Sequence, residues 1–296
     1  MQNFVCDLGF SSLKWMYAGR KGRIVSVCQH LGDSLVVGED ALLQAGSSYL
    51  KTIEDLVHYY PAFVKHAARE AMVEGVVRLV VGLPYGVWQA EKDKQAGLVA
   101  TLKKVLQASG YPEVMVLPQG LGGVRLFLDQ AGEITGNILG IDIGFNTVIF
   151  TLYSPQKQTI IFGDTFHKRG VHQMATQLLL PAIRDLAPSR SFTPVEVSYL
   201  IERGYLQYGF ERHDITPEIV KAAKVYIENV LRDVHGEIQA HVGLRSEFDT
   251  VLLFGGGATL IKDQVAAKKI QVVILPEPEF ANAAGFRLIA ERNGKR

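Results

Sequence analysis

One strand-turn-strand pattern occurs twice in the chain, about half its length apart. The first copy covers residues 4–14 and reads FVCDLGFSSLK, and the second covers residues 140–150 and reads GIDIGFNTVIF. Each copy has an apolar run, then Asp-x-Gly-Phe, then two small polar residues and a second strand-like run. This order predicts a β-hairpin whose glycine adopts backbone angles that a side chain would disfavour. Because the pattern is repeated, it indicates two structurally related halves.

The predicted hairpin tips offer amide and hydroxyl donors suited to phosphate. The polar tip residues are Ser11, Ser12, Asn146 and Thr147. Donors from two tips would hold a polyphosphate from opposite sides, and Asp7 and Asp142, each at the end of a strand, would hold a hydrated Mg²⁺ between them. A single such hairpin is also typical of an ordinary tight turn, so the prediction depends on the repeat.

The length and composition are those of a folded protein with two domains. The chain has 296 residues, of which 48% are hydrophobic and 21% charged, a composition that argues against disorder. The polar, glycine-containing segment 131–137 is the predicted junction, which gives domains of residues 1–137 and 138–296. A formal charge of +1 predicts no direct binding to nucleic acid or to an anionic membrane.

The cysteines and the apolar runs indicate the compartment. Cys6 and Cys28 are too few for a disulfide framework. The N-terminus lacks a signal-peptide pattern, and no apolar run approaches the ~20 residues that span a bilayer. We therefore expect a soluble, cytoplasmic protein.

Apolar periodicity predicts a mixed α/β fold with strands and helices in both halves. In the first half, a third strand at 23–29 would extend the hairpin, further strands are predicted at 76–81 and 114–117, and helices at 55–74, 89–109 and 122–130. In the second half, a hairpin is predicted at 138–153, strands at 159–162, 250–254 and 272–275, and helices at 170–180, 193–204, 216–242 and 281–291.

Two further segments suggest ligand contacts. Gly255, Gly256 and Gly257 follow a strand and precede a helix start at Thr259, where the backbone can approach a flat ligand or a phosphate closely. A plain strand-helix turn is the alternative, since neither a Walker loop nor the spaced-glycine dinucleotide fingerprint is present. Gln119 ends a strand, and its amide could orient a water without taking the proton. From the residues alone, the favoured interpretation is that Gln119 lies in a turn with its side chain exposed to solvent.

These motifs resemble those of the actin superfamily. Residues 7–12, 142–147 and 254–258 are similar to its phosphate-1, phosphate-2 and adenosine motifs. The segments VGLP (81–84), LPQG (117–120) and EFANAAGF (279–286) resemble bacterial and archaeal actin-like proteins of the ParM/StbA plasmid-partition type. The hairpin pair alone is shared with sugar kinases and heat-shock chaperones, and the smaller motifs narrow the choice.

The resemblance covers essentially the whole chain in order and implies a fold. That fold is α/β, with two ribonuclease-H-like domains around a nucleotide cleft. The final helix, 281–291, would return to the first domain. Because the chain is short for an actin, the small outer subdomains would be reduced.

The resemblance also implies roles for the motif residues of the first half. Asp7 would hold Mg²⁺ through water. Gly9, Ser11 and Ser12 would cradle the β- and γ-phosphates. Lys14 would reach phosphate if its side chain points inward.

Roles for the motif residues of the second half, and for Gln119 of the first, follow in the same way. Asp142 and Gln119 would position the attacking water, with Asp142 also beside the metal. Gly144, Asn146 and Thr147 would complete the phosphate clamp.

The base and ribose would lie farther along the cleft. Gly255, Gly256 and Gly257 would pack beside adenosine. Glu202 matches the position of a ribose-contacting glutamate, although its neighbour is Ile201 where many actins have lysine.

The function implied is slow, filament-coupled hydrolysis of ATP (or GTP) with Mg²⁺. The partners would be further copies of the chain, in a homopolymeric filament, and a DNA-bound adaptor protein if the task is DNA segregation. Two alternatives remain open. A small-molecule kinase would need a carboxylate base where Gln119 stands, and a nucleotide-bound scaffold would neither polymerise nor turn over.

Overall fold

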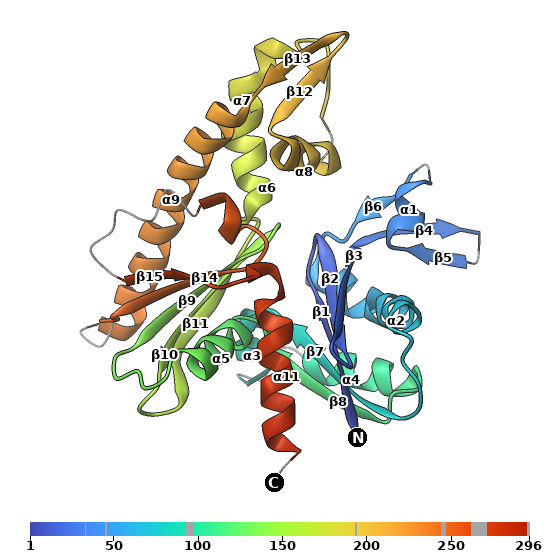
Figure 1. The fold of residues 1–296 in the computed structure, drawn as a ribbon, viewed down its shortest axis with the longest axis vertical. Coiled ribbons are helices and arrows are strands. Elements are labelled where there is room, and N and C mark those ends of the chain that lie inside the picture. The colour runs from blue at the N-terminus through green and yellow to red at the C-terminus, as the bar shows by residue number, and fades with distance from the viewer. Residues whose placement is uncertain are drawn as a thin grey trace.

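The chain folds around two five-stranded sheets that share one strand order (Figure 1). A computed structural model describes residues 1–32, 34–44, 46–92, 97–192, 194–243, 247–261 and 271–294. The first sheet has the order β3-β2-β1-β7-β8, with β1 (Gln2–Leu8), β2 (Ser12–Tyr17), β3 (Arg20–Val25), β7 (Val77–Leu83) and β8 (Glu113–Pro118). The second has the order β11-β10-β9-β14-β15, with β9 (Ile138–Ile143), β10 (Thr147–Ser154), β11 (Thr159–His167), β14 (Thr250–Phe254) and β15 (Gln271–Ile274).

Both sheets combine an antiparallel meander with two parallel strands. In the first, β1 pairs antiparallel with β2 and parallel with β7. In the second, β9 pairs antiparallel with β10 and parallel with β14. The repeat in the sequence is therefore a repeat of the whole sheet, and it confirms the predicted α/β fold with two ribonuclease-H-like units.

Helices cover both faces of the first sheet. Alternate residues of β1 face opposite sides, so Phe4 packs in the cluster under α2 (Ile53–Glu70) and Val5 in the cluster under α11 (Ala281–Asn293). Helix α2 begins with a capping box between Thr52 and Asp55. Helix α4 (Leu98–Ala108) packs beside α2, and α9 (Thr216–Val242) lines the core of the second sheet.

Two helices cross from one half of the chain to the sheet of the other. Helix α5 (Leu121–Gln130) follows the first sheet but packs on the second through Val124, which lies in one cluster with Phe254. Helix α11 ends the chain but packs on the first sheet through Phe286. The two helices cross so closely that a Cβ on Gly285 would lie 1.9 Å from the carbonyl oxygen of Gly122. The final helix thus returns to the first sheet, as the resemblance implied.

A small outer lobe stands at the top of each half (Figure 1). In the first half, β4 (Val27–Leu31), β5 (Ser34–Val37) and β6 (Ser48–Tyr49) form a separate sheet beside α1 (Glu39–Leu42). In the second, the lobe contains α7 (Leu180–Ile183), α8 (Pro194–Arg203) and the hairpin of β12 (Tyr205–Tyr208) with β13 (Glu211–Asp214). That hairpin was not predicted.

The predicted third strand is present and extends the hairpin, but it covers Arg20–Val25 instead of 23–29, because the strand ends before Ser26. The Ser26 N–H donates to Ser11 O at 2.9 Å, its hydroxyl donates to Gly9 O at 2.6 Å, and its carbonyl accepts from the Leu50 N–H at 3.2 Å. Ser26 therefore lies between the two sheets, with β3 in the first sheet and β4 in the sheet of the outer lobe.

Two helix predictions also differ from the structure. The helix expected at 89–109 is divided: α3 (Tyr85–Lys92) begins directly after Pro84, and α4 begins after Gly97. The helix expected at 170–180 is irregular, since α6 (Val171–Met174) passes into a π-helical turn at Ala175–Leu179 before α7. Thr193, the first residue of the helix predicted at 193–204, lies outside the described residues.

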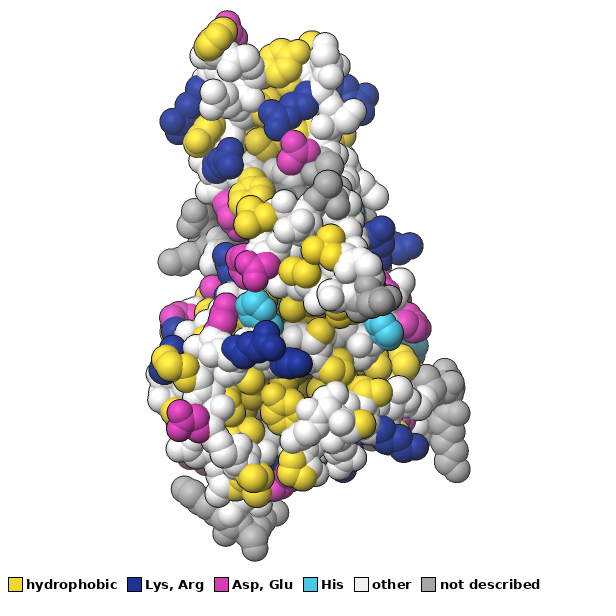
Figure 2. Space-filling view, turned by 90° about the vertical axis from the view of Figure 1, so that its right-hand side faces the viewer, with side chains coloured by type: hydrophobic (Ala, Val, Ile, Leu, Met, Phe, Trp, Pro, Cys, Tyr) yellow, Lys and Arg dark blue, Asp and Glu magenta, His cyan; other side chains and the backbone are white. Residues whose placement is uncertain are grey.

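Seen from the side of the first half, the molecule is elongated and narrows toward the upper lobe (Figure 2). Basic and acidic side chains are scattered over this face, without a continuous stripe of either sign among the described residues. None of the described helices combines the length and apolar character needed to cross a membrane.

Candidate functional site

A cavity of about 550 Å³ lies between the two sheets, at the ends of the strands that carry the repeated motif. Its volume is in the range of small-molecule sites. Every predicted site residue lines it except Asn146: Asp7, Gly9, Ser11, Ser12, Lys14, Gln119, Asp142, Gly144, Thr147, Glu202, Gly255, Gly256 and Gly257. The two copies of the motif therefore face one space, as the sequence predicted.

The two turns have the same internal geometry. The Gly9 N–H donates to Ser12 O at 3.0 Å, and the Gly144 N–H donates to Thr147 O at 2.9 Å. The predicted reason for these glycines is wrong, because neither has a positive φ. A Cβ on Gly144 would lie 3.2 Å from Thr147 O, which is a tight contact, whereas one on Gly9 would lie 3.4 Å from Ser12 O, which is an ordinary one.

Asp7 and Lys14 face each other across the first hairpin. They are register partners on β1 and β2, and both side chains are buried. The Lys14 Nζ donates to Ser12 O at 3.3 Å and so lies beside the turn. Lys14 thus points inward, which was the condition for its predicted contact with phosphate.

Gln119 lies beside Asp7 rather than in an exposed turn. It is 6% exposed, and its Nε2 donates to Asp7 Oδ1 at 2.7 Å. Its own N–H donates to Leu83 O at 2.7 Å, which ties the segment after β8 to the end of β7. The structure thus favours the cavity over the exposed turn that the residues alone suggested.

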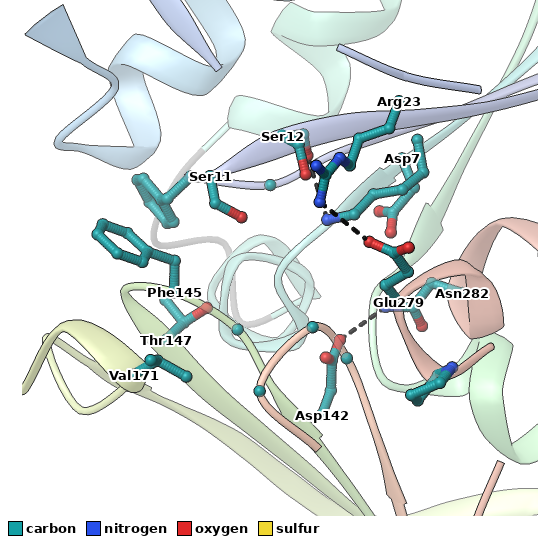
Figure 3. A pocket seen from close by; sticks show the side chains of 18 of the residues that line it. Asp7, Ser11, Ser12, Arg23, Asp142, Phe145, Thr147, Val171, Glu279 and Asn282 are labelled. Atoms are coloured by element: carbon teal, nitrogen blue, oxygen red, sulfur yellow. Dashed lines mark hydrogen bonds and ion pairs between the residues drawn. The ribbon is translucent and has the colours of Figure 1, made fainter. Parts of the chain in front are cut away.

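Asp142 approaches the cavity from the second sheet (Figure 3). Burial, and then the charge of Asp7, raise its pKa to about 7, while the hydrogen bond from Asn282 acts in the opposite direction. Burial also raises the pKa of Asp7, against the charge of Lys14 and the bond from Gln119. Two buried carboxylates therefore share a space that contains one buried lysine.

This pair fits a hydrated Mg²⁺. The ion prefers carboxylate oxygens and keeps several of its waters. A divalent charge would favour the ionised form of both carboxyl groups, against the burial that raises both pKa values and the charge of Asp7 that further raises the pKa of Asp142. Asp7 and Asp142 are the residues that would hold it.

The glycine triplet packs against the end of β9. A Cβ on Gly255, whose φ is +84°, would lie 2.2 Å from Asp142 Oδ1, and one on Gly257 would lie 2.5 Å from Ile143 Cγ2. Gly256 has open space at this position and lines the cavity. The described residues after the triplet form a 3₁₀ turn, Ala258–Ile261, where the sequence predicted a helix start.

The remaining predicted residues lie at the rim. Glu202, late in α8, lines the cavity and is itself exposed. Asn146 lies outside the lining and donates across the gap between the halves to Lys51 O at 3.5 Å. Beside it, Phe145 stacks on Tyr49 of β6 with ring centroids 5.7 Å apart. The second turn thus touches the outer lobe of the first half.

Sequence reasoning gave no individual role to Asn282 or Arg23. Asn282, near the start of α11, donates to Asp142 Oδ2 at 2.6 Å. Arg23 on β3 lines the cavity and lies 3.6 Å from Glu279 (Figure 3). A polar residue in the apolar segment FANAAGF was the available signal for Asn282. No such signal pointed to Arg23, because the predicted strand began at this residue, whereas in the structure Arg23 lies within β3.

The comparisons with known proteins find relatives by structure alone. No protein-family profile and no curated protein sequence matches the chain. A ParM from a 15-stranded filament of Clostridium botulinum has a TM-score of 0.75 at 15% identity, covering 98% of this chain and 99% of that one. An archaeal actin homologue, Ta0583, in complex with ADP has a TM-score of 0.73 at 18% identity, covering 99% and 100%.

A third solved structure is MreB5 of Spiroplasma citri bound to ADP. Its TM-score is 0.68 at 13% identity, covering 99% of this chain and 97% of that one. At such identities the likeness concerns the fold. The repeated sheet, the shared cavity and the match over nearly the whole length of each neighbour lead to one conclusion: this chain has the actin-like fold of the ParM and archaeal actin homologues.

Proposed function

We propose that this protein binds Mg-ATP between its two halves, hydrolyses it slowly, and assembles into filaments with nucleotide. The observation that carries the proposal is the equivalence of the two turns: Gly9 and Gly144 close them with matching hydrogen bonds, and both line one cavity with Asp7 and Asp142. Solved proteins of the same fold are described as bound to ADP or AMPPNP, and one as a filament.

The proposed chemistry is the attack of water on the γ-phosphorus. The bond from phosphorus to the β,γ-bridging oxygen breaks, and the products are ADP, inorganic phosphate and a proton. Bound Mg²⁺ would supply positive charge to the phosphate oxygens. Ser11, Ser12 and Thr147 would donate to the phosphates, while Asp142 and Gln119 would orient the water.

The filament would be a homopolymer, and DNA segregation through a DNA-bound adaptor is the task we propose for it. ParM is among the solved neighbours, which supports this choice. The scattered charges of the face in Figure 2 and the formal charge of +1 favour an adaptor over direct contact with nucleic acid.

Assays of the purified chain with Mg-ATP and Mg-GTP test the proposal. We expect saturable binding, slow release of phosphate, and a sedimenting polymer that disappears after hydrolysis. Asp142→Ala should abolish phosphate release, and Asp185→Ala, at an exposed position, should not. Persistent monomers across protein and salt concentrations would reject polymerisation, and transfer of labelled phosphate to a small molecule would favour a kinase.

A further inference from the structure

Asn282 is a buried polar residue that makes two hydrogen bonds in opposite senses. It is 5% exposed, near the N-terminal end of α11. Its Nδ2 donates to Asp142 Oδ2 at 2.6 Å, and its Oδ1 accepts from the Gly120 N–H at 3.1 Å. The Asn282 amide therefore contacts both Asp142, at the end of a strand of the second sheet, and Gly120, in the turn that follows the last strand of the first sheet.

That turn also carries Gln119, whose Nε2 donates to Asp7 Oδ1 at 2.7 Å. The polar contacts thus run from Asp142 through Asn282 and Gly120 to Gln119 and Asp7. The Asn282 amide lowers the pKa of both carboxyl groups against the rise that burial causes. Its side chain therefore acts on both sides of the cavity.

The backbone of Asn282 has little freedom to move. A Cβ on Gly122 would lie 2.5 Å from the Asn282 carbonyl oxygen and 2.6 Å from its Cα, so α5 and α11 are in direct contact there. From this fixed backbone position, the side chain at 282 must donate a hydrogen bond to Asp142 and accept one from the Gly120 N–H. An ionised aspartate could accept from Gly120 but could not donate to Asp142, and alanine could do neither.

We propose that Asn282 is a positioning residue for hydrolysis, which holds Asp142 and Gln119 in a fixed relation across the cavity. The proposal rests on the function proposed above. The phosphates would be held by the two turns, and the attacking water by the groups that Asn282 orients. Losing Asn282 should therefore slow the chemical step more than it weakens nucleotide binding.

The experiment compares Asn282→Ala and Asn282→Asp with the wild-type chain. Single-turnover hydrolysis of γ-labelled Mg-ATP gives the rate of the chemical step, and a fluorescent ATP analogue gives affinity. We expect hydrolysis to fall about 10- to 100-fold, the usual cost of losing a group that orients a ligand-bearing carboxylate. Affinity should change far less. Asn293→Ala, at the exposed end of the same helix, is the matched control and should hydrolyse normally.

A double-mutant cycle separates positioning from a general structural effect. Because Asn282 and Gln119 would act through one set of contacts, Asn282→Ala with Gln119→Ala should be little slower than the worse single variant. Thermal unfolding checks that each variant is folded. If the Asn282→Ala variant does not fold, the Asn282→Asp variant, which keeps the shape of the side chain, still tests the proposal.

Three results would overturn the inference. They are normal hydrolysis by the folded Asn282 variants, a parallel loss of affinity and rate, and additive effects in the cycle. Absence of hydrolysis by the wild-type chain would overturn this inference and the proposed function together. Hydrolysis that is normal in both wild-type and Asn282 variants would overturn this inference alone.

Discussion

At the scale of single residues, the most unusual feature is the pair of buried carboxylates. Asp142 is 7% exposed and Asp7 5% exposed, and each raises the energy of the other's ionised form. Such a site is costly for the empty protein and becomes favourable when a cation occupies it. The two residues therefore link the stability of the fold to pH and to its ligand.

The empty protein should lose stability as the pH rises. The folded-state pKa of Asp142, about 7, lies above its ordinary value of 3.8. The folded state therefore retains the proton between these values while the unfolded state releases it, and the free energy of unfolding falls across this window. Each unit of difference is worth about 1.4 kcal/mol, so the upper limit is about 4 kcal/mol.

Asp142→Asn tests this expectation, because asparagine cannot ionise. Thermal unfolding without nucleotide or metal should show the variant well above the wild type at pH 8 and equal to it near pH 4. Asp185→Asn, at an exposed position, should show no such trend. A difference between Asp142→Asn and wild type that is constant with pH would contradict the prediction.

Arg23 should contribute to nucleotide affinity. It lines the cavity and lies opposite Lys14 on the neighbouring strand, so that the two positive charges, of which Arg23 is also paired with Glu279, would attract an anionic phosphate. Arg23→Gln should weaken ATP binding about tenfold, or ~1.4 kcal/mol, with a larger effect at low salt. Arg20→Gln is the control, since Arg20 on the same strand donates to Glu70 O and Ala71 O. Equal affinities in titrations of the two variants would count against Arg23.

The sequence revealed the identity of the polar motif residues of the cavity better than their contacts. The repeat brought Asp7, Asp142 and the turn residues other than Asn146 to the cavity, because spacing along a hairpin is local. It did not reveal that Asn282 reaches Asp142, because these two residues are 140 positions apart in the chain and periodicity carries no information on such contacts.

At the scale of elements, the crossing of α5 and α11 joins the two halves. Helix α5 packs on the second sheet and α11 on the first, so each half holds a helix whose chain comes from the other. The sequence predicted both helices, at 122–130 and 281–291, close to their bounds in the structure. It predicted the return of α11 only through the resemblance to actin-like proteins.

A side chain at this crossing should destabilise the whole fold. A Cβ on Gly285 meets the backbone of Gly122, which cannot rotate away, so Gly285→Ala should lower the free energy of unfolding by about 3 kcal/mol. In Gly236→Ala, within α9, the new Cβ meets open space, and the higher helix propensity of alanine should raise stability by about 1 kcal/mol. Urea titrations of both variants measure the change in the free energy of unfolding, which we expect to be negative for Gly285→Ala and positive for Gly236→Ala.

Element boundaries were predicted least well where tertiary bonds replace local ones. The apolar alternation of residues 23–29 is that of a strand, yet Ser26 bonds to the first turn and divides it. The hairpin at 205–214 was missed because its strands are short and mostly exposed, so they lack the alternating apolar pattern of a core strand.

At the scale of the whole molecule, the two halves also meet above the cavity. Phe145 of the second turn stacks on Tyr49 and lies 5.4 Å, centroid to centroid, from His172. This aromatic contact and the bond from Asn146 to Lys51 O close the gap beside the turns. A nucleotide leaving on this side would have to part them.

Phe145→Ala should therefore release nucleotide faster. An aromatic pair contributes about 0.5–1.5 kcal/mol, which corresponds to an increase in the dissociation rate of up to about tenfold. Stopped-flow displacement of a fluorescent ATP analogue, below the concentration at which polymer forms, measures that rate. Phe210→Ala, at the exposed tip of the β12–β13 hairpin, should leave the rate unchanged. Identical release by the two variants would mean that the aromatic contact does not limit exit.

The bonds of Ser26 connect the first turn to the outer lobe of its half. Because Ser26 directly precedes β4, a displacement of β4 would strain the hydrogen bonds from Ser26 to Gly9 O and Ser11 O. An accessory protein that binds this lobe could thus alter how strongly ATP is held without reaching into the cavity. By thermodynamic reciprocity, ATP would change the affinity of that protein for the lobe by the same factor.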